Sequence, residues 1–148
     1  MTDAPASAHP GGSSLRSMTT RHSHDTLDQL QQSTRSLRHA IPDVWGGFAS
    51  LRRAAMAAGT LPASLKEGLA LAIAAAKQCD GCIAYHAEAA ARAGAKPAEV
   101  AELLGVVVLM DGGPGTVYAP KAWDAFLEFS DAAIDPGLAT NTTASVRP

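Results

Sequence analysis

The sequence predicts an all-α fold, a compact bundle of five to six helices joined by short loops. Hydrophobic residues make up 47% of the 148 residues and alanine dominates them, while aromatic residues are only 5%. Alanine is the strongest helix former, and the sequence has no long alternation of Val, Ile and Thr of the kind that forms strands. Charged residues at 18% give the ordinary balance of a single globular domain.

Polar stretches at both ends delimit the predicted helical domain. Residues 1–22 are rich in Ser, Thr, Pro, Gly and Ala, and we interpret them as a disordered tail. Residues 135–148 form a second polar tail. The helical domain is therefore expected to span residues 23–134.

The composition also restricts the expected location and partners. The net charge is −2, with 12 basic and 14 acidic residues and no basic stripe, so a nucleic-acid partner is not expected. The N-terminus has no apolar run of signal-peptide length. The longest uncharged apolar stretches, Gly68–Ala76 and Leu103–Met110, are too short to span a bilayer. These features predict a soluble cytoplasmic protein that does not associate with membranes.

Two helices are expected before the apolar centre of the chain. Asp25–Ala40 is a polar segment whose leucines recur at helical spacing on one side. Pro42 then begins a second helix, since proline is favoured in a first helical turn. This second helix runs to Gly59, which we expect to cap its C-terminus.

The third predicted helix, Pro62–Gln78, carries no charge between Glu67 and Lys77. A helix that is apolar on every side is expected to be buried on every side. Several of the alanine-rich helices lack a clear polar face, and surplus apolar surface favours contact between subunits. We therefore predict a homo-oligomer.

Three further helices complete the predicted bundle. The fourth contains both cysteines and runs to about Ala93, with Gly94 just past its end. Pro97 opens the fifth helix, which the Gly-Gly-Pro sequence at residues 112–114 stops. The sixth covers roughly Val117–Ala133, and its inward-facing side chains are expected to be those of Trp123, Phe126 and Leu127.

The segment CDGCIAYH in the fourth helix places three reactive side chains in a row. Cys79 and Cys82 are three residues apart, and His86 follows four residues after Cys82. Steps of three and four keep side chains on one face of a helix, one turn apart. The sequence therefore predicts a stripe of Cys79, Cys82 and His86, the thiol–histidine stripe, which we interpret as a thiol-based redox site.

The expected chemistry of the stripe follows from its position at the start of a helix. Two thiols one turn apart can form a disulfide with little backbone movement, and a helix N-terminus stabilises a thiolate. His86 can accept the proton of Cys82, which favours Cys82 as the attacking thiol, whereas the helix-terminus argument alone favours Cys79. Glu67 is expected to be a partly desolvated carboxylate, and its nearest expected partners are His86 and the thiols. The hypothesis is a relay from Glu67 through His86 to a cysteine.

Three other interpretations of these residues stay open at this point. A lone C-x-x-C also occurs by chance, with the cysteines acting as small buried apolar residues. A structural zinc needs four ligands, of which the stripe supplies three and Glu67, His22 or His24 the fourth. The absence of a second C-x-x-C weighs against zinc, and we expect no resident metal or cofactor. A non-redox lyase or isomerase could use Glu67 and His86 on a small organic acid.

The span Leu61–Leu104 resembles the alkylhydroperoxidase D-like proteins of the carboxymuconolactone decarboxylase superfamily. The resemblance rests on LPASLKEGLALAIAAAKQCDGCIAYHAEAAARAGAKPAEVAELL. Within this span eleven, two and three residues separate Glu67, Cys79, Cys82 and His86, and these intervals match the family's redox motif. The segment HAEAAARAGA and the start of the next helix match as well.

The resemblance implies an alkylhydroperoxidase D-like all-α fold, assembled as trimers or hexamers, and the reduction of hydroperoxides in antioxidant defence. It implies catalysis by a redox-active disulfide with a proton relay, carried here by Cys79, Cys82, His86 and Glu67. The implied partners are a small-molecule hydroperoxide and a dithiol reductant, which in the best-known members is a lipoyl-bearing protein.

Two details of the sequence refine this expectation. Asp80-Gly81 stands where some hydroperoxidases have a second histidine between the cysteines, which implies a simpler relay here. Members that decarboxylate a muconolactone generally lack the cysteine pair, so its presence argues against that activity.

Overall fold

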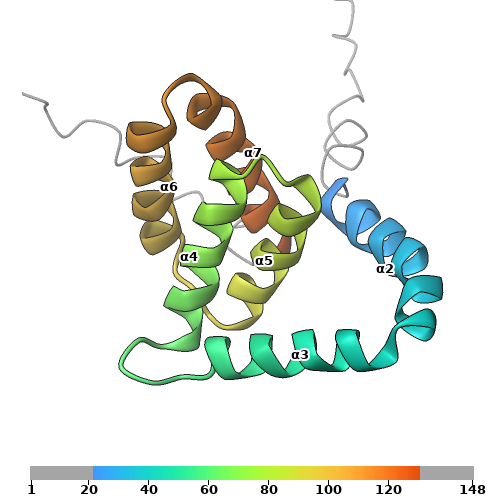
Figure 1. Cartoon of the computed structure of the whole chain (residues 1–148). Helices are drawn as coiled ribbons and strands as arrows, with labels where there is room; N and C mark the ends of the chain where they lie inside the picture. Colours follow the sequence, from blue (N-terminus) through green and yellow to red (C-terminus); the bar gives the residue numbers. More distant parts are fainter. Residues whose placement is uncertain (1–21, 131–148) are drawn as a thin grey trace, which may run out of the picture.

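A computed structural model of the chain describes residues 22–130, and this part of the chain is all-α, as predicted. Its helices, shown in Figure 1, are α2 (His22–Ala40), α3 (Pro42–Met56), α4 (Ala63–Ala76), α5 (Asp80–Arg92), α6 (Pro97–Asp111) and α7 (Gly113–Phe129). The predicted disordered tail, apart from its last residue His22, lies outside the described residues, as do the last residues of the predicted domain and the predicted C-terminal tail.

Helices α4 to α7 pack together around the hydrophobic core (Figure 1). Three large side chains, those of Leu71, Val100 and Phe126, are completely buried there. Alanines on α4, α5 and α7 fill the space between them, which lets the helix backbones approach closely. Replacing one large core side chain by alanine typically costs about 2–5 kcal/mol of unfolding free energy. The cysteine segment therefore joins two helices, α4 and α5, of a stably packed four-helix core.

Gly115 shows how closely two of these helices approach. A Cβ atom at this position would lie 2.8 Å from the carbonyl oxygen of Val107 and 3.1 Å from Cα of Val108, both backbone atoms. No side chain fits there without moving α6 away from α7, so glycine is required for this contact.

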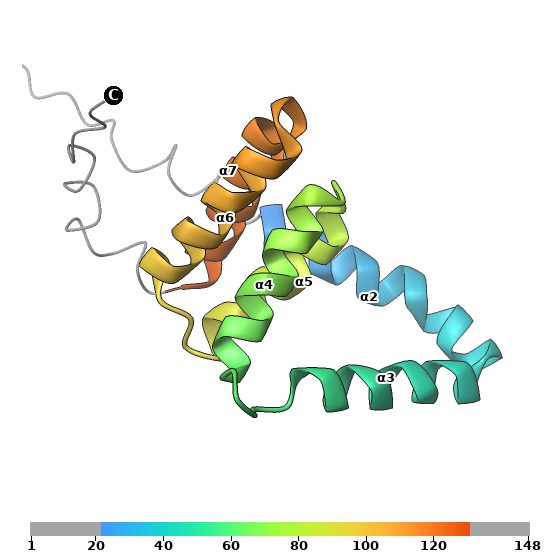
Figure 2. The same ribbon diagram turned by 60° about the vertical axis from the view of Figure 1, so that its left-hand side comes forward.

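Helices α2 and α3 form an arm outside the four-helix core, and the two views in Figures 1 and 2 agree on this arrangement. Helix α2 packs mainly on α5, and Leu27 is its one buried leucine. Helix α3 has no buried residue. Its C-terminal end is held by Lys66 of α4, whose Nζ donates hydrogen bonds to the carbonyl oxygens of Ala55 (3.0 Å) and Ala57 (2.7 Å).

The predicted helix starts at Pro42 and Pro97 are confirmed, while several other boundaries differ. Helix α2 begins at His22 rather than Asp25, because the Glu128 carboxylate accepts hydrogen bonds from the backbone N–H groups of Ser23 and His24, both at 3.1 Å. Such a partner satisfies N–H groups that a helix start otherwise leaves unpaired.

The second helix ends earlier than predicted. Helix α3 stops at Met56 with Ala57 as its cap, so the prediction that the helix reaches Gly59 and is capped by it is wrong. In contrast, the prediction that Gly94 lies just past the end of its helix is confirmed. Gly94 follows α5 in the left-handed conformation, with φ of 78°, which is common at that position.

The Gly-Gly-Pro sequence ends one helix and also begins the next. Helix α7 starts at Gly113 rather than Val117, because Pro114 lies in its first turn, where the missing N–H costs no hydrogen bond. The inward-facing side chains predicted for this helix are confirmed: Phe126 is fully buried, and Trp123 and Leu127 pack against the core.

The third helix is shorter than predicted, and the expectation that it is buried on all sides is wrong. Helix α4 spans Ala63–Ala76, with Pro62 as its N-cap. It packs its Leu71 face against α5, α6 and α7, whereas Leu69 and Ile73 are 46% and 52% exposed on the other side. An apolar side that the described residues leave exposed thus runs along α4. None of the described helices is long and apolar enough to cross a membrane.

Candidate active site

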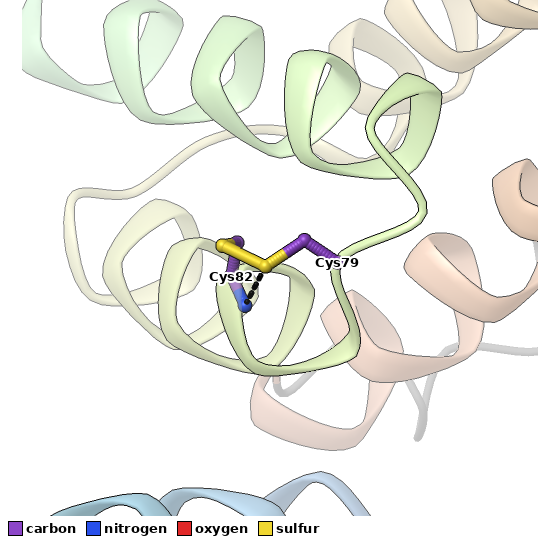
Figure 3. The surroundings of a disulfide bond; sticks show 2 residues. All are labelled: Cys79 and Cys82. Carbon is purple, nitrogen blue, oxygen red and sulfur yellow. Dashed lines mark hydrogen bonds between the residues drawn. A yellow bond between two sulfur atoms is a disulfide. The ribbon is translucent and has the colours of Figure 1, made fainter. Parts of the chain in front are cut away.

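The cysteine pair lies at the N-terminus of α5, directly after a sharp turn from α4. Cys79 is the N-cap of α5 rather than a helical residue, which corrects the expected helix start, and Cys82 lies in the first turn. A disulfide joins them, with their Cα atoms 5.2 Å apart. Figure 3 shows this disulfide and the hydrogen bond that the backbone N–H of Cys82 donates to Sγ of Cys79, at 3.3 Å.

The turn before Cys79 is built by a hydrogen-bond pattern that ends α4. The N–H of Cys79 bonds to the carbonyl of Ala74 (3.1 Å), and the N–H of Gln78 bonds to the carbonyl of Ala75 (2.9 Å). This pair of bonds defines a Schellman motif, which needs a left-handed residue just after the cap. Gln78 takes that conformation with φ of 54°, which is unusual for a residue with a side chain. The motif reverses the chain and delivers Cys79 to the start of α5.

The short loop that the disulfide closes and the exposure of Cys82 favour thiol–disulfide exchange over a role in stabilising the fold. A loop of about four residues restricts the unfolded chain by about 2 kcal/mol, against about 3 kcal/mol for a 15-residue loop. Cys82 is exposed, while Cys79 is partly buried. Accessible disulfides are the ones that other thiols can attack.

Glu67 and His86 face each other across the contact between α4 and α5. Nδ1 of His86 lies 2.8 Å from Oε2 of Glu67, and the Glu67 side chain is only 8% exposed. A buried carboxylate needs such a partner, because an unpaired charge away from water is strongly destabilising. If Nδ1 carries the proton shared with Glu67, Nε2 of the neutral imidazole is an acceptor that can take a proton from elsewhere.

The structure thus brings the four predicted residues together at one junction. Cys82 and His86 share a face of α5 one turn apart, Cys79 extends that row from the N-cap, and Glu67 joins it from α4. Among the described residues, no hydrogen bond connects His86 with either sulfur. The arrangement offers a dithiol/disulfide pair and, beside it, a carboxylate–imidazole pair able to hold a proton.

The two residues between the cysteines are held by neighbouring helices. Nζ of Lys121 on α7 lies 3.6 Å from Oδ1 of Asp80. Gly81 lies against Leu30 of α2, since a Cβ atom at Gly81 would lie 2.8 Å from Cδ1 of that leucine. The first turn of α5 thus contacts both α2 and α7, closely through Gly81 and more loosely through the exposed Asp80–Lys121 pair.

A groove of about 340 Å³ opens beside Glu67. We call it the Arg52 groove, and its lining residues are Arg52, Ala63, Glu67, Tyr85, Glu88, Ala89, Arg92 and Ala93. A larger hollow of about 570 Å³ lies between α2, α5 and α7 but is lined by none of the four predicted site residues. Of the two, only the smaller groove is lined by one of the predicted site residues, Glu67.

Two further side chains, those of Arg52 and Tyr85, lie close to the paired Glu67 and His86. The Tyr85 ring meets the His86 ring edge to face, with centroids 5.2 Å apart, and the Arg52 guanidinium lies 5.0 Å from the centre of the Tyr85 ring. Arg52 was not singled out from the sequence, because its position depends on how the arm folds back on α5. No local sequence signal reports that contact.

The described residues do not assemble the ligands that the zinc alternative requires. Cys79 and Cys82 are bonded to each other, and His24 packs on Phe129 with ring centroids 4.3 Å apart. Within residues 22–130, no group of three His, Cys, Asp or Glu side chains is arranged to hold a metal ion.

A family profile and a solved structure indicate the same family. The profile of the Carboxymuconolactone decarboxylase family matches residues 42–125, from the start of α3 into α7. An uncharacterized protein of Cupriavidus necator is 38% identical over 96 residues, which cover 65% of this chain and 85% of that protein. The crystal structure of a carboxymuconolactone decarboxylase family protein from Legionella pneumophila, in its apo form, has a TM-score of 0.72 and 37% identity, and the match covers 74% of this chain and 98% of that one.

Proposed function

The chain belongs to the carboxymuconolactone decarboxylase family, and we propose that within this family it is a thiol-dependent peroxidase that reduces organic hydroperoxides through Cys79 and Cys82. The observation that carries the proposal is the pairing of Glu67 with His86 at 2.8 Å, one helical turn from the exposed Cys82 of the disulfide. A structural disulfide needs no such buried acid–base pair beside it.

In the proposed oxidation, the thiolate of Cys82 attacks the terminal oxygen of the hydroperoxide. The O–O bond breaks, Cys82 becomes a sulfenic acid, and the alkoxide takes up a proton to leave as the alcohol. The thiolate of Cys79 then attacks the sulfur of Cys82, forms the disulfide and releases the oxygen as water. One hydroperoxide and two thiols thus give one alcohol, one water and one disulfide.

The proposed relay moves the protons of these steps. His86 accepts the thiol proton of Cys82 through Nε2 and returns it to the departing oxygen, while Glu67 stabilises the imidazolium through Nδ1. The position of Glu67 in the protein interior supports this role, because a charge pair is stronger where water is excluded.

The disulfide is reset by a dithiol reductant, for which a lipoyl-bearing partner protein is proposed. Exposure favours attack on the sulfur of Cys82, which leaves Cys79 as the departing thiolate. The N–H of Cys82 already points at Sγ of Cys79, and the α5 N-terminus favours negative charge there. The second thiol of the reductant then releases Cys82, so that both cysteines return to the thiol form.

We also propose that the protein is a homo-oligomer, a trimer or hexamer. Leu109 and Met110 at the end of α6 are 80% and 79% exposed, and Val44, Phe48 and Leu51 of α3 are exposed as well. Exposed apolar area gathered on neighbouring turns supports coverage by another subunit.

The test is turnover of cumene hydroperoxide with dihydrolipoamide as the reductant. The wild-type protein is expected to consume both, and the variant carrying Cys79→Ser and Cys82→Ser is expected to consume neither. Absence of turnover by the fully reduced wild type would contradict the proposal. Stoichiometric zinc with unreactive thiols would instead support a structural metal protein, and activity of the double variant on a small organic acid would support a lyase.

A further inference from the structure

The Arg52 groove lies next to the buried end of the proposed relay. Glu67 is part of its wall, and Ala63, Ala89 and Ala93 give it an apolar lining from α4 and α5. Its volume of about 340 Å³ is at the small end of the range for ligand sites, about 300–1,000 Å³. The groove is therefore of a size for a small organic molecule.

The charged groups of the groove are paired with one exception. Glu67 is bonded to His86, and Glu88 forms an ion pair with Arg92. Among the described residues, no carboxylate lies within ion-pair distance of Arg52. The one cation of the groove without a carboxylate partner in the described chain is thus the Arg52 guanidinium.

Tyr85 holds this guanidinium in place. The ring centre lies 5.0 Å from Cζ of Arg52, a cation–π contact that orients the flat group without using its N–H donors. A guanidinium with its fork unoccupied matches the two oxygens of a carboxylate. Because the same Tyr85 ring touches the ring of His86, a molecule held by Arg52 lies beside the relay.

We infer that the Arg52 groove binds a small organic carboxylate, with Arg52 as the residue that recognises the anion. A singly charged group fits better than a phosphate, since Arg52 is the one cation of the groove without a carboxylate partner in the described chain and leaves a second negative charge unmatched. In the proposed reaction, on which this step rests, the preferred substrate is a hydroperoxide that carries a carboxylate.

Calorimetry with an unreactive pair of ligands tests the binding site directly. Para-isopropylbenzoate and para-isopropylbenzamide have the same shape and differ in charge. The wild-type disulfide form is expected to bind the acid about tenfold more tightly than the amide, because a hydrogen bond between two charged groups is stronger by about that factor. Arg52→Gln is expected to remove this preference, while Arg53→Gln, at the adjacent arginine of α3 outside the groove, keeps it.

Several results would overturn the inference. The wild type could bind acid and amide with equal affinity, or fail to bind the acid at all. The preference could also be lost in Arg53→Gln, or phenyl phosphate could bind more tightly than the benzoate. Turnover of para-carboxycumene hydroperoxide and cumene hydroperoxide separates this inference from the proposed function. Binding preference without any turnover leaves the site standing and defeats the peroxidase, whereas turnover with no preference for the acid defeats the site alone.

Discussion

Oε2 of Glu67 on α4 and Nδ1 of His86 on α5 are 2.8 Å apart, which joins the most buried carboxylate of the described chain to the helix that has Cys79 as its N-cap and Cys82 in its first turn. Nineteen positions separate the two residues. The contact exists because the Schellman turn at Gln78 reverses the chain between the two helices.

Glu67→Gln is expected to lower the peroxidase rate by about 10²-fold, the lower part of the range for general acid–base catalysis. The amide keeps the shape and a hydrogen bond to His86 but cannot stabilise the imidazolium. Glu102→Gln, an exposed position of α6, is the matched control and should leave the rate unchanged. Steady-state turnover of both variants, with a thermal melt to show that each is folded, makes the comparison. An equal rate for Glu67→Gln and wild type would remove Glu67 from the relay.

Single cysteine variants identify the attacking thiol. Cys79→Ser is expected to react once with hydroperoxide and to keep a sulfenic acid on Cys82, because no second thiol is present to displace it. Cys82→Ser should react much more slowly, since its remaining thiol is partly buried. Trapping with dimedone and mass spectrometry measures the adduct. A strong adduct on Cys79 in the second variant would assign the attack to that residue instead.

Much of the site was accessible from the sequence, because helical spacing and one buried acid are local signals. The three- and four-residue steps from Cys79 to His86 need only a helix, and Glu67 was conspicuous in an otherwise uncharged apolar segment. Arg52 was not accessible, since its place beside Tyr85 depends on the return of the arm towards α5. The helix starts at Pro42 and Pro97 were predicted from the prolines themselves, whereas the early start of α2 depends on Glu128, more than a hundred residues away.

The turns that follow α4 and α5 are of the same kind. Comparing them measures the backbone strain at Gln78, the residue before Cys79. Gly94 has φ of 78° after α5, and Gln78 has φ of 54° after α4. The left-handed region costs a residue with a side chain about 1 kcal/mol relative to glycine. Gln78→Gly is therefore expected to raise the unfolding free energy by about that amount, and Gly94→Gln to lower it similarly. Urea denaturation tests both, and a loss of stability in Gln78→Gly would show that its side chain makes a contact that outweighs the strain.

The exposed end of α6 gives a test of assembly. Replacing Leu109 and Met110 together by Gln is expected to shift the mass measured by light scattering from the oligomer towards the monomer, because burial of these side chains would no longer be favourable. Glu102→Gln on the same helix should keep the oligomer. A wild-type protein that is monomeric at every concentration would contradict the proposed assembly.

The measurement that tests the central proposal most directly is a count of thiols on the reduced protein before and after one equivalent of cumene hydroperoxide. The account predicts two titratable thiols per chain before the addition and none after it, with one alcohol formed per chain and a Cys79–Cys82 disulfide found by peptide mapping. Two thiols still present after the addition, with the hydroperoxide unconsumed, would contradict it.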